Sequence, residues 1–336
     1  MKFFKVLFKI IGILLLSVLA VVVLAWSALH LAKYFMYPDY YAYYEVASPI
    51  PNIHGGFVPQ GLGYDAASDT YFHSGYNANG SAVELHLVNT NESKCLYPIY
   101  DGETTPAKGH GGGIAVAGDY VYVADNAEEG DGKVGKLNVF RLSDLKNAKN
   151  GDTVKAISAI TVDTSASFCF SDGKYVYVGE FYRAVNYETA KSHHFTTPAG
   201  DENKALLSAY PLNSDGTLAD TLPSFSVSIT DQVQGFAITA DGKIALSRSW
   251  GLNASKLTIY NGWTDIGAKI NTSGKEVPLY FLDSATLQKD CSFPAFSEGL
   301  ALNADGDLLI SFESACNKYI IGKLFFATNV VSYPID

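Results

Sequence analysis

The sequence predicts an all-β domain, a β-propeller of five blades, preceded by a single N-terminal transmembrane helix. Three observations lead to this prediction. A short motif recurs five times, an uncharged apolar run stands near the N-terminus, and helical periodicity is absent elsewhere. The 22 tyrosines and 19 phenylalanines agree with stacked sheets, because sheet faces accept flat, bulky side chains.

The first element is the apolar run from Ile10 to Leu29, 20 residues without a charge. A membrane-spanning helix needs roughly 20 apolar residues, whereas the core of a signal peptide has about 7–15. Three lysines precede the run and only one follows it closely, namely Lys2, Lys5, Lys9 and Lys33. The positive-inside rule then predicts a cytoplasmic N-terminus and an extracytoplasmic C-terminal domain.

The alternative is a cleaved signal peptide and a secreted domain, because small residues such as Ala25 and Ala28 lie where a peptidase acts. The length of the run favours the retained anchor. The chain thus divides into a cytoplasmic tip with membrane anchor (1–33), a tyrosine-rich linker or closing strand (34–54) and the propeller (55–336). Pro38 and Asp39 are expected to break any helix in the tyrosine-rich stretch.

Each repeat begins with a run of small residues, continues through a turn that carries Asp, and ends in a β-branched or aromatic strand. The runs begin at positions 60, 112, 165, 234 and 298, so successive repeats are 52, 53, 69 and 64 residues apart. This period suits a four-stranded sheet, the unit of a β-propeller. Six blades remain an alternative, because the two longest repeats leave room for a degenerate sheet.

The fourth repeat illustrates how one blade is expected to form. Its innermost strand is Gly235–Ile238, whose small residues let the strands crowd around the axis. A hairpin turn follows at Ala240-Asp241-Gly242, because Asp-Gly tolerates the positive φ angles that two-residue hairpins require. Either Leu257–Tyr260 or Leu279–Leu282 supplies the third strand, and the segment near Cys291 supplies the fourth.

The charge of the C-terminal domain argues against two kinds of partner. All 34 acidic residues lie beyond residue 33, against 20 of the 24 lysines and arginines, which gives this part a net charge of about −14. Proteins that bind nucleic acid normally carry a basic stripe, and this sequence has none. An anionic lipid surface would also repel the domain.

The four cysteines are too few for a disulfide scaffold. If the domain lies outside the membrane, one bridge is allowed, and Cys291–Cys316 is the shorter-range candidate. Cys169 occupies an inner-strand position and is expected to be a small, buried apolar residue.

Two segments resemble known propeller repeats. Gly113–Val116 with Tyr120–Asn126 resembles an NHL repeat, and Ser171–Val178 resembles a YVTN repeat. From residue 55 to 336 the chain also resembles uncharacterised secreted bacterial propellers and, more distantly, the gluconolactonase and strictosidine-synthase-like propellers. The resemblance implies the fold but no single activity, because such repeats serve enzymes, sensors and scaffolds alike.

The propeller geometry predicts which residues share one rim. In each blade the start of the first strand and the end of the second lie together, because a hairpin joins the two strands at the other end. The five starts and the five ends are Gln60, Gly112, Ser165, Gln234, Glu298, Tyr76, Asp125, Glu180, Ser249 and Glu313. His110 precedes one start, and Arg248 and Trp250 flank the end at Ser249. We call this edge the entry rim.

One hypothesis places a hard cation such as Ca²⁺ at the entry rim, held by the carboxylates of Asp125, Glu180, Glu298 and Glu313. The resemblance to gluconolactonase-like propellers implies a Glu directly before a Gly at a strand start, and Glu298-Gly299 matches it. The other starts carry Gln or smaller residues, so the match to a calcium-dependent lactonase or esterase is incomplete.

The favoured hypothesis is a binding or interaction module for a small polar ligand or a protein. A pocket for a ligand such as a sugar would be formed at the entry rim by amides, an aromatic face and charged groups, namely Gln60, Tyr76, His110, Gln234, Arg248 and Trp250. No His or Lys stands at a strand end as a general base, which favours binding over catalysis. A third interpretation is that these groups only cap strand ends.

Two further motifs carry weaker signals. Gly109–Gly113 looks like a phosphate-binding loop, but no helix follows it. His193-His194 lies in a long insertion and is expected in a solvated loop.

Overall fold

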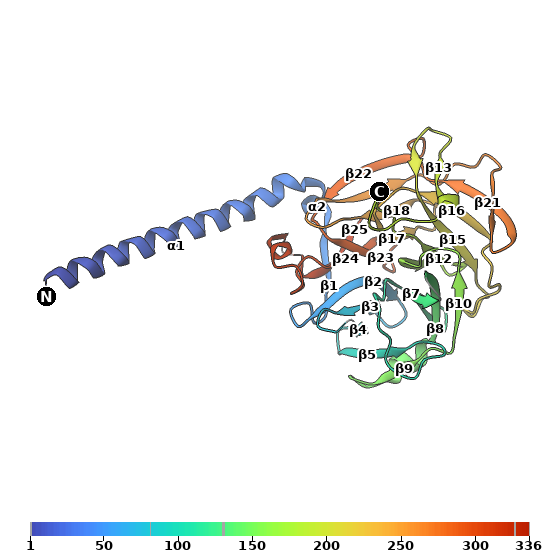
Figure 1. Ribbon diagram of the computed structural model, residues 1–336, viewed down its shortest axis with the longest axis horizontal. Coiled ribbons are helices and arrows are strands. Elements are labelled where there is room, and N and C mark those ends of the chain that lie inside the picture. Colours follow the sequence, from blue (N-terminus) through green and yellow to red (C-terminus); the bar gives the residue numbers. More distant parts are fainter. Residues whose placement is uncertain (1, 81, 130–131, 326, 336) are drawn as a thin grey trace.

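Five four-stranded antiparallel sheets surround a central axis, and one long helix projects from them (Figure 1). This arrangement comes from a computed structural model that describes residues 2–80, 82–129, 132–325 and 327–335. The propeller has five blades, so the alternative of six is wrong. The innermost strands of the five blades contact one another around the axis: β2 with β6, β6 with β11, β11 with β17, β17 with β23, and β23 with β2.

The blades follow the order of the repeats. Blade 1 consists of β2 (Phe57–Asp65), β3 (Thr70–Asn77), β4 (Val83–Val88) and β5 (Ser93–Ile99). Blade 2 consists of β6 (Gly113–Ala117), β7 (Tyr120–Glu129), β8 (Gly132–Arg141) and β10 (Ser158–Val162). Blade 3 consists of β11 (Phe168–Ser171), β12 (Tyr175–Gly179), β15 (Ala205–Pro211) and β16 (Phe225–Ile229).

Blade 4 consists of β17 (Val233–Ile238), β18 (Ile244–Arg248), β19 (Ser255–Tyr260) and β22 (Leu287–Phe293). Blade 5 consists of β23 (Ser297–Leu302), β24 (Leu308–Phe312), β25 (Asn329–Tyr333) and β1 (Glu45–Pro49). The outermost strand of blade 5 therefore comes from the N-terminal side of the chain. Its register runs from Glu45 opposite Ser332 to Pro49 opposite Asn329, which joins the two ends of the ring.

Blades 1 and 3 each gain extra strands from a connection within the next blade. The connection between the third and fourth strands of blade 2 contains β9 (Thr153–Lys155), which pairs in parallel with β5 of blade 1. The corresponding connection of blade 4 contains β20 (Lys269–Thr272) and β21 (Lys275–Phe281), and β21 pairs in parallel with β16 of blade 3. Outer edges that would otherwise expose unpaired backbone groups are thus covered by a segment of the next blade.

The structure decides between the two candidates for the third strand of the fourth blade and lengthens its turn. Its third strand is β19, whereas Leu279–Leu282 falls on β21 and its continuation, at the edge of blade 3. The turn at Ala240–Gly242 extends one residue further on each side, because Thr239 and Lys243 also belong to it and close it with a backbone hydrogen bond. Only Gly242 has a positive φ, of 87°.

Close packing at the axis explains the glycines of the repeat. A Cβ added at Gly61 would lie 2.5 Å from the backbone nitrogen of Ile114 in blade 2. A Cβ added at Gly299 would lie 2.4 Å from the backbone nitrogen of Leu62 in blade 1. No side chain fits at these distances, so the innermost strands approach so closely only because these positions are glycine.

The core lies between neighbouring blades. One face of blade 1 packs against blade 2 through Phe72, Leu85, Val121 and Phe140. The other face, which carries Leu62, belongs to the largest apolar cluster and packs with residues of blade 5 such as Leu300. Each blade is therefore covered on both faces, as aromatic-rich sheets require.

The N-terminal helix α1 (Lys2–Met36) projects away from the propeller (Figure 1). The segment from Phe3 to Met36 is long and apolar enough to cross a membrane. None of its most apolar part is buried by the rest of the protein. An apolar helix of this length without a covering partner fits an anchor better than a core helix.

The helix break at Pro38 takes a different form from the one expected. α1 ends at Met36, but a second helix, α2 (Pro38–Tyr43), starts at the proline itself, a position that tolerates the missing N–H. Tyr40 of α2 is only 4% exposed and its ring lies 5.1 Å from that of Phe293 in blade 4. The tyrosine-rich stretch is thus docked on the propeller. A third short helix is α3 (Leu142–Asn147).

The four cysteines are all free. The candidate bridge between Cys291 and Cys316 is therefore absent, and both thiols are buried separately. Cys169 is buried at 5% exposure on β11, as its inner-strand position predicts.

Candidate functional site

The entry rim forms as the strand register requires. Val58 pairs with Tyr76 in blade 1 and Val233 pairs with Arg248 in blade 4, so strand starts and strand ends lie side by side. The side chains of Gln60, Glu298 and Glu313 are buried there. Their polar groups must therefore find partners within the protein.

The two glutamates of blade 5 form a carboxyl pair. Glu298 is the second residue of β23 and Glu313 follows β24, and their side chains share a hydrogen bond. The Gln60 amide donates to Oε2 of Glu313 over 3.0 Å, and the Gln234 amide lies 3.4 Å from Oε1 of Glu298. Three blades thus contribute to this cluster, as the alignment of the repeats predicts.

The electrostatics of the pair point to one shared proton. Burial, followed by the charge of Glu313, raises the pKa of Glu298 well above its usual range. Burial raises the pKa of Glu313 to about 7, although Lys318 and the Gln60 amide act in the opposite direction. Once Glu313 ionises, Glu298 keeps its proton and donates it to Glu313, because two adjacent buried carboxylates cannot both ionise cheaply.

The loop between β24 and β25 adds residues that the repeats do not reveal. Its Lys318 ammonium contacts the Tyr76 hydroxyl and lies 4.8 Å from the centre of the Tyr76 ring. Tyr319 stacks on Phe296 at 4.7 Å and hydrogen-bonds to both Tyr76 and Glu313. This loop follows the last repeat motif and has no counterpart in the other repeats, so the pattern carries no signal for it.

Asp125 is engaged in a different contact. Its carboxylate accepts hydrogen bonds from the backbone N–H groups of His110 and Gly111, at 3.3 and 2.8 Å, and from the Tyr100 hydroxyl at 3.0 Å. The glycine-rich loop therefore wraps a carboxylate of its own blade where a phosphate-binding loop would hold a phosphate.

Glu180 is likewise bound within its own blade. Both of its oxygens lie 3.0 Å from Nδ1 of His193, and one also accepts the N–H of Leu206 at 3.0 Å. Burial alone would lower the pKa of His193, but the hydrogen bond and charge of Glu180 raise it overall. The histidine insertion is thus docked at this point, in contrast to the expected solvated loop.

The remaining entry-rim residues make local pairs. Arg248 donates to the carboxylate of Asp231 at 2.9 Å, and the guanidinium of Arg183 lies 4.3 Å from the ring of Trp250. The rings of Tyr76 and His110 lie 4.7 Å apart. The structure therefore brings Gln60, Gln234, Glu298 and Glu313 together, and engages Asp125, Glu180 and Arg248 in contacts of their own.

A cavity of about 650 Å³ lies at the opposite rim, where the innermost strands end in their hairpin turns. All five blades contribute the end of an inner strand, as shown by the lining residues Tyr64, Val116, Asp172, Thr239 and Leu302. We call this space the turn-rim cavity. Its volume is in the range of small-molecule sites, about 300–1,000 Å³.

Four neighbouring aromatic rings line one side of the turn-rim cavity, namely Tyr175, Tyr177, Phe225 and Trp263. Tyr64 lines the cavity from blade 1, where its ring packs beside Tyr71. Trp263 stacks on Tyr280 at 5.2 Å with an interplanar angle of 18°, which holds its ring in place. Phe225 lies 5.4 Å from Trp263 and 5.2 Å from Tyr175. The rings of Tyr175, Tyr177, Phe225 and Trp263 therefore support one another and form a continuous surface.

Polar groups stand at the edge of this aromatic surface. The Asp172 carboxylate accepts the Tyr177 hydroxyl at 3.1 Å and the N–H groups of Lys174 and Tyr175 at 2.8 Å each. Lys174 is exposed at the opening. A flat apolar wall beside a carboxylate, an ammonium and hydroxyls can bind a ligand that is apolar on one face and polar at its edges.

Sequence reasoning placed the ligand site at the entry rim and missed the turn-rim cavity. A partial signal was present, since Asp172 and the YVTN-like tyrosines stand at a repeat turn. Trp263 could not be placed, because it lies in the connection that carries β20 and β21 to blade 3.

Comparisons with known proteins add the following. No family model matches the chain, and no curated protein matches it. Solved structures with a similar fold include a putative glucose dehydrogenase from Thermus thermophilus, 11% identical with a TM-score of 0.44, covering 86% of this chain and 98% of that one.

Two others are a PQQ-bound aldose sugar dehydrogenase from Streptomyces coelicolor and a gluconolactonase from Xanthomonas campestris. The first is 10% identical with a TM-score of 0.46, and covers 86% of this chain and 96% of that one. The second is 11% identical with a TM-score of 0.39, and covers 87% of this chain and 88% of that one. At this level of similarity the activities of these proteins carry no information about the present chain.

Proposed function

We propose that the protein is a membrane-tethered, extracytoplasmic propeller that binds a small polar ligand with an apolar face, such as a sugar, in the turn-rim cavity. The observation that carries the proposal is the aromatic wall of Tyr175, Tyr177, Phe225 and Trp263 beside a space of about 650 Å³. Sugar rings bind such surfaces through their C–H faces, while their hydroxyls reach polar groups at the edge, here Asp172 and Lys174.

The entry rim is the poorer candidate for the ligand-binding site. Gln60, Glu298, Glu313 and Asp125 are buried, and each already has a hydrogen-bond partner in the protein. A ligand there would have to replace those contacts, whereas the turn-rim cavity offers open volume.

The test is a screen of mono- and oligosaccharides against the full chain in detergent, followed by titration of each hit. Trp263→Ala should weaken binding by at least about 10-fold, because loss of a stacked ring costs on the order of 1–3 kcal/mol. Trp250→Ala is the matched control, since Trp250 is an entry-rim aromatic. If Trp250→Ala abolishes binding and Trp263→Ala does not, the ligand lies at the entry rim and the cavity assignment is wrong.

A second candidate is calcium-dependent hydrolysis at the entry rim. The Glu298–Glu313 pair favours it, because a divalent cation could displace the shared proton and find oxygen ligands from both carboxylates. Ca²⁺ at 100 times its dissociation constant should stabilise the fold by about 2.7 kcal/mol, and a chelator should remove the gain. If Glu298→Gln leaves metal content and thermal stability in Ca²⁺ unchanged, this candidate is excluded.

A further inference from the structure

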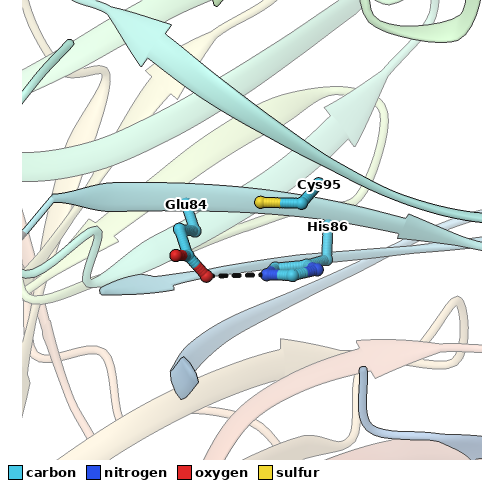
Figure 2. A group of neighbouring side chains, drawn as sticks. All are labelled: Glu84, His86 and Cys95. Carbon is cyan, nitrogen blue, oxygen red and sulfur yellow. Dashed lines mark hydrogen bonds and ion pairs between the residues drawn. The ribbon is translucent and has the colours of Figure 1, made fainter. Parts of the chain in front are cut away.

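Blade 1 carries a cluster of metal-ligating side chains that includes none of the residues discussed above as ligands. Glu84 and His86 lie on β4 and Cys95 lies on the neighbouring strand β5 (Figure 2). Their ligating atoms all lie within 4.8 Å of one another. Figure 2 shows the three side chains turned toward a common point, with the Glu84 carboxylate beside the His86 ring.

The strand register explains why these residues meet. His86 pairs with Cys95 across the β4–β5 ladder, so the two side chains point to the same face. Glu84 is two residues before His86 and therefore also points to that face. On the other side of β4, His73 pairs with His86 across the β3–β4 ladder and extends the same row. Donors from three strands thus lie on one face of the blade.

Because the cluster is buried, each of its polar atoms needs a partner within the protein. Glu84 and His86 are each 3% exposed, and Oε2 of Glu84 lies 2.9 Å from Nε2 of His86. Asn77 donates to the other oxygen of Glu84 at 2.9 Å. These contacts account for Glu84 and for one nitrogen of His86.

His73 supplies the second observation. It is fully buried, and neither of its ring nitrogens has a hydrogen-bond partner among the residues that the structure describes. A buried imidazole without partners is unfavourable, because its polar atoms lose their contacts with water and gain nothing in return. His73 pairs with His86 across the β3–β4 ladder, so this unpartnered imidazole stands on the same sheet face as the other three donors.

We propose that Glu84, His86 and Cys95 bind Zn²⁺ on this face of blade 1, with His73 as the fourth ligand. Oxygen, nitrogen and thiolate donors together suit zinc, whereas Ca²⁺ and Mg²⁺ take oxygen ligands. With bonds of about 2.0–2.3 Å, the donors of a tetrahedral zinc lie about 3.3–3.8 Å apart. Glu84, His86 and Cys95 therefore need only small side-chain movements to close around the ion, whereas His73 would have to turn toward them from β3.

The ion would join β3, β4 and β5 of one blade. Binding would release the thiol proton of Cys95 and break the hydrogen bond between Glu84 and His86, since both atoms of that bond become ligands. Cys95 is only half-buried, which gives the ion a path from solvent.

The test uses the full chain in detergent, purified without a histidine tag and kept reduced. After incubation with Zn²⁺ and dialysis, elemental analysis should find one zinc per chain. Co²⁺ in place of zinc should give a thiolate-to-cobalt charge-transfer band, which only a cysteine ligand produces. Cys95→Ser should abolish the band and weaken zinc binding by at least about 100-fold, more than the 10–100-fold that loss of a second-shell partner costs.

Cys291→Ser is the matched control, because Cys291 is a free cysteine on β22 of blade 4 and should leave both readouts unchanged. His73→Gln should weaken zinc binding, and an unchanged affinity would remove His73 from the site. Circular dichroism of each variant establishes that it is folded. Folded wild-type protein that retains no zinc, or a Cys95→Ser variant that keeps the cobalt band, would overturn the proposal.

Discussion

At the scale of single residues, the entry rim shows how burial and proximity decide the state of a carboxyl group. Glu298 and Glu313 are far apart in sequence from Gln60, yet the strand start of β23 and the strand end of β24 place the two carboxyls in contact beside its amide. Neither pKa is near its usual value because neither group can be solvated. The protonation of the Glu298–Glu313 pair is therefore coupled to folding.

The first prediction concerns the pH dependence of stability. The pKa of Glu313 rises from the ordinary 4.5 to about 7 on folding, and burial also raises the pKa of Glu298 well above its usual range. Between these values the folded state binds more protons than the unfolded state, so stability must fall as the pH rises through this range. The contribution is complete below about pH 4.5. We expect the unfolding temperature to drop by several degrees from pH 5 to pH 8.

Glu298→Gln tests this assignment, because the amide keeps the size and the donor of the protonated acid but cannot ionise. The variant should lose part of the pH dependence while matching the wild type at pH 5. Asp305→Asn, at an exposed turn of the same blade, should leave the curve unchanged. His193 titrates in an overlapping range, so the difference between variant and wild type is the informative quantity. Parallel curves for Glu298→Gln and the wild type would contradict the shared proton.

At the scale of elements, the propeller depends on strands that come from distant parts of the chain. β1 pairs with β25 and completes blade 5, and α2 packs Tyr40 against Phe293 directly before it. β9 and β21 cover the outer edges of blades 1 and 3 in the same way. These pairings are non-local, so each depends on the ring being closed around it.

The second prediction follows from this closure. A variant that lacks residues 1–33 should fold, because α2 and β1 remain. A variant that lacks residues 1–49 exposes the edge of β25 and loses the burial of Tyr40, a side chain whose burial is worth about 2 kcal/mol. It should unfold at a markedly lower temperature or aggregate. Thermal unfolding followed by circular dichroism, together with size-exclusion chromatography, compares the two, and equal stability would contradict the closing role of β1.

At the scale of the whole molecule, the sequence was sufficient to predict the ring of blades. It was insufficient to predict the residues that the connecting segments bring to the two rims. The glycine-containing strand starts are visible because close approach at Gly61 and Gly299 permits no other residue type. The contact between Gln60 and Glu313 follows from the same alignment. Trp263 and Lys318 could not be predicted, because both lie in connections whose paths are fixed by tertiary contacts and leave no periodic pattern.

The blade 1 cluster shows a second limit. Glu84, His86 and Cys95 are spaced as ordinary strand residues, and only the register of β4 against β5 brings Cys95 beside His86. A sequence pattern cannot reveal that register, since the connection between the strands allows more than one pairing.

The third prediction concerns the orientation of the molecule in the membrane. α1 leaves the propeller with its apolar surface uncovered, and the three lysines at its start oppose transfer of that end across the membrane. A cysteine placed in the propeller at the exposed Lys149 should then react with a membrane-impermeant maleimide in intact cells, whereas one placed at Lys5 should react only after lysis. The wild type serves as the background, because three of its four cysteines are buried and Cys95 is half-buried. Labelling of Lys5→Cys but not Lys149→Cys in intact cells would reverse the orientation. Recovery of the labelled propeller in the medium without residues 1–28 would instead establish cleavage, in which case α1 acts as a signal peptide.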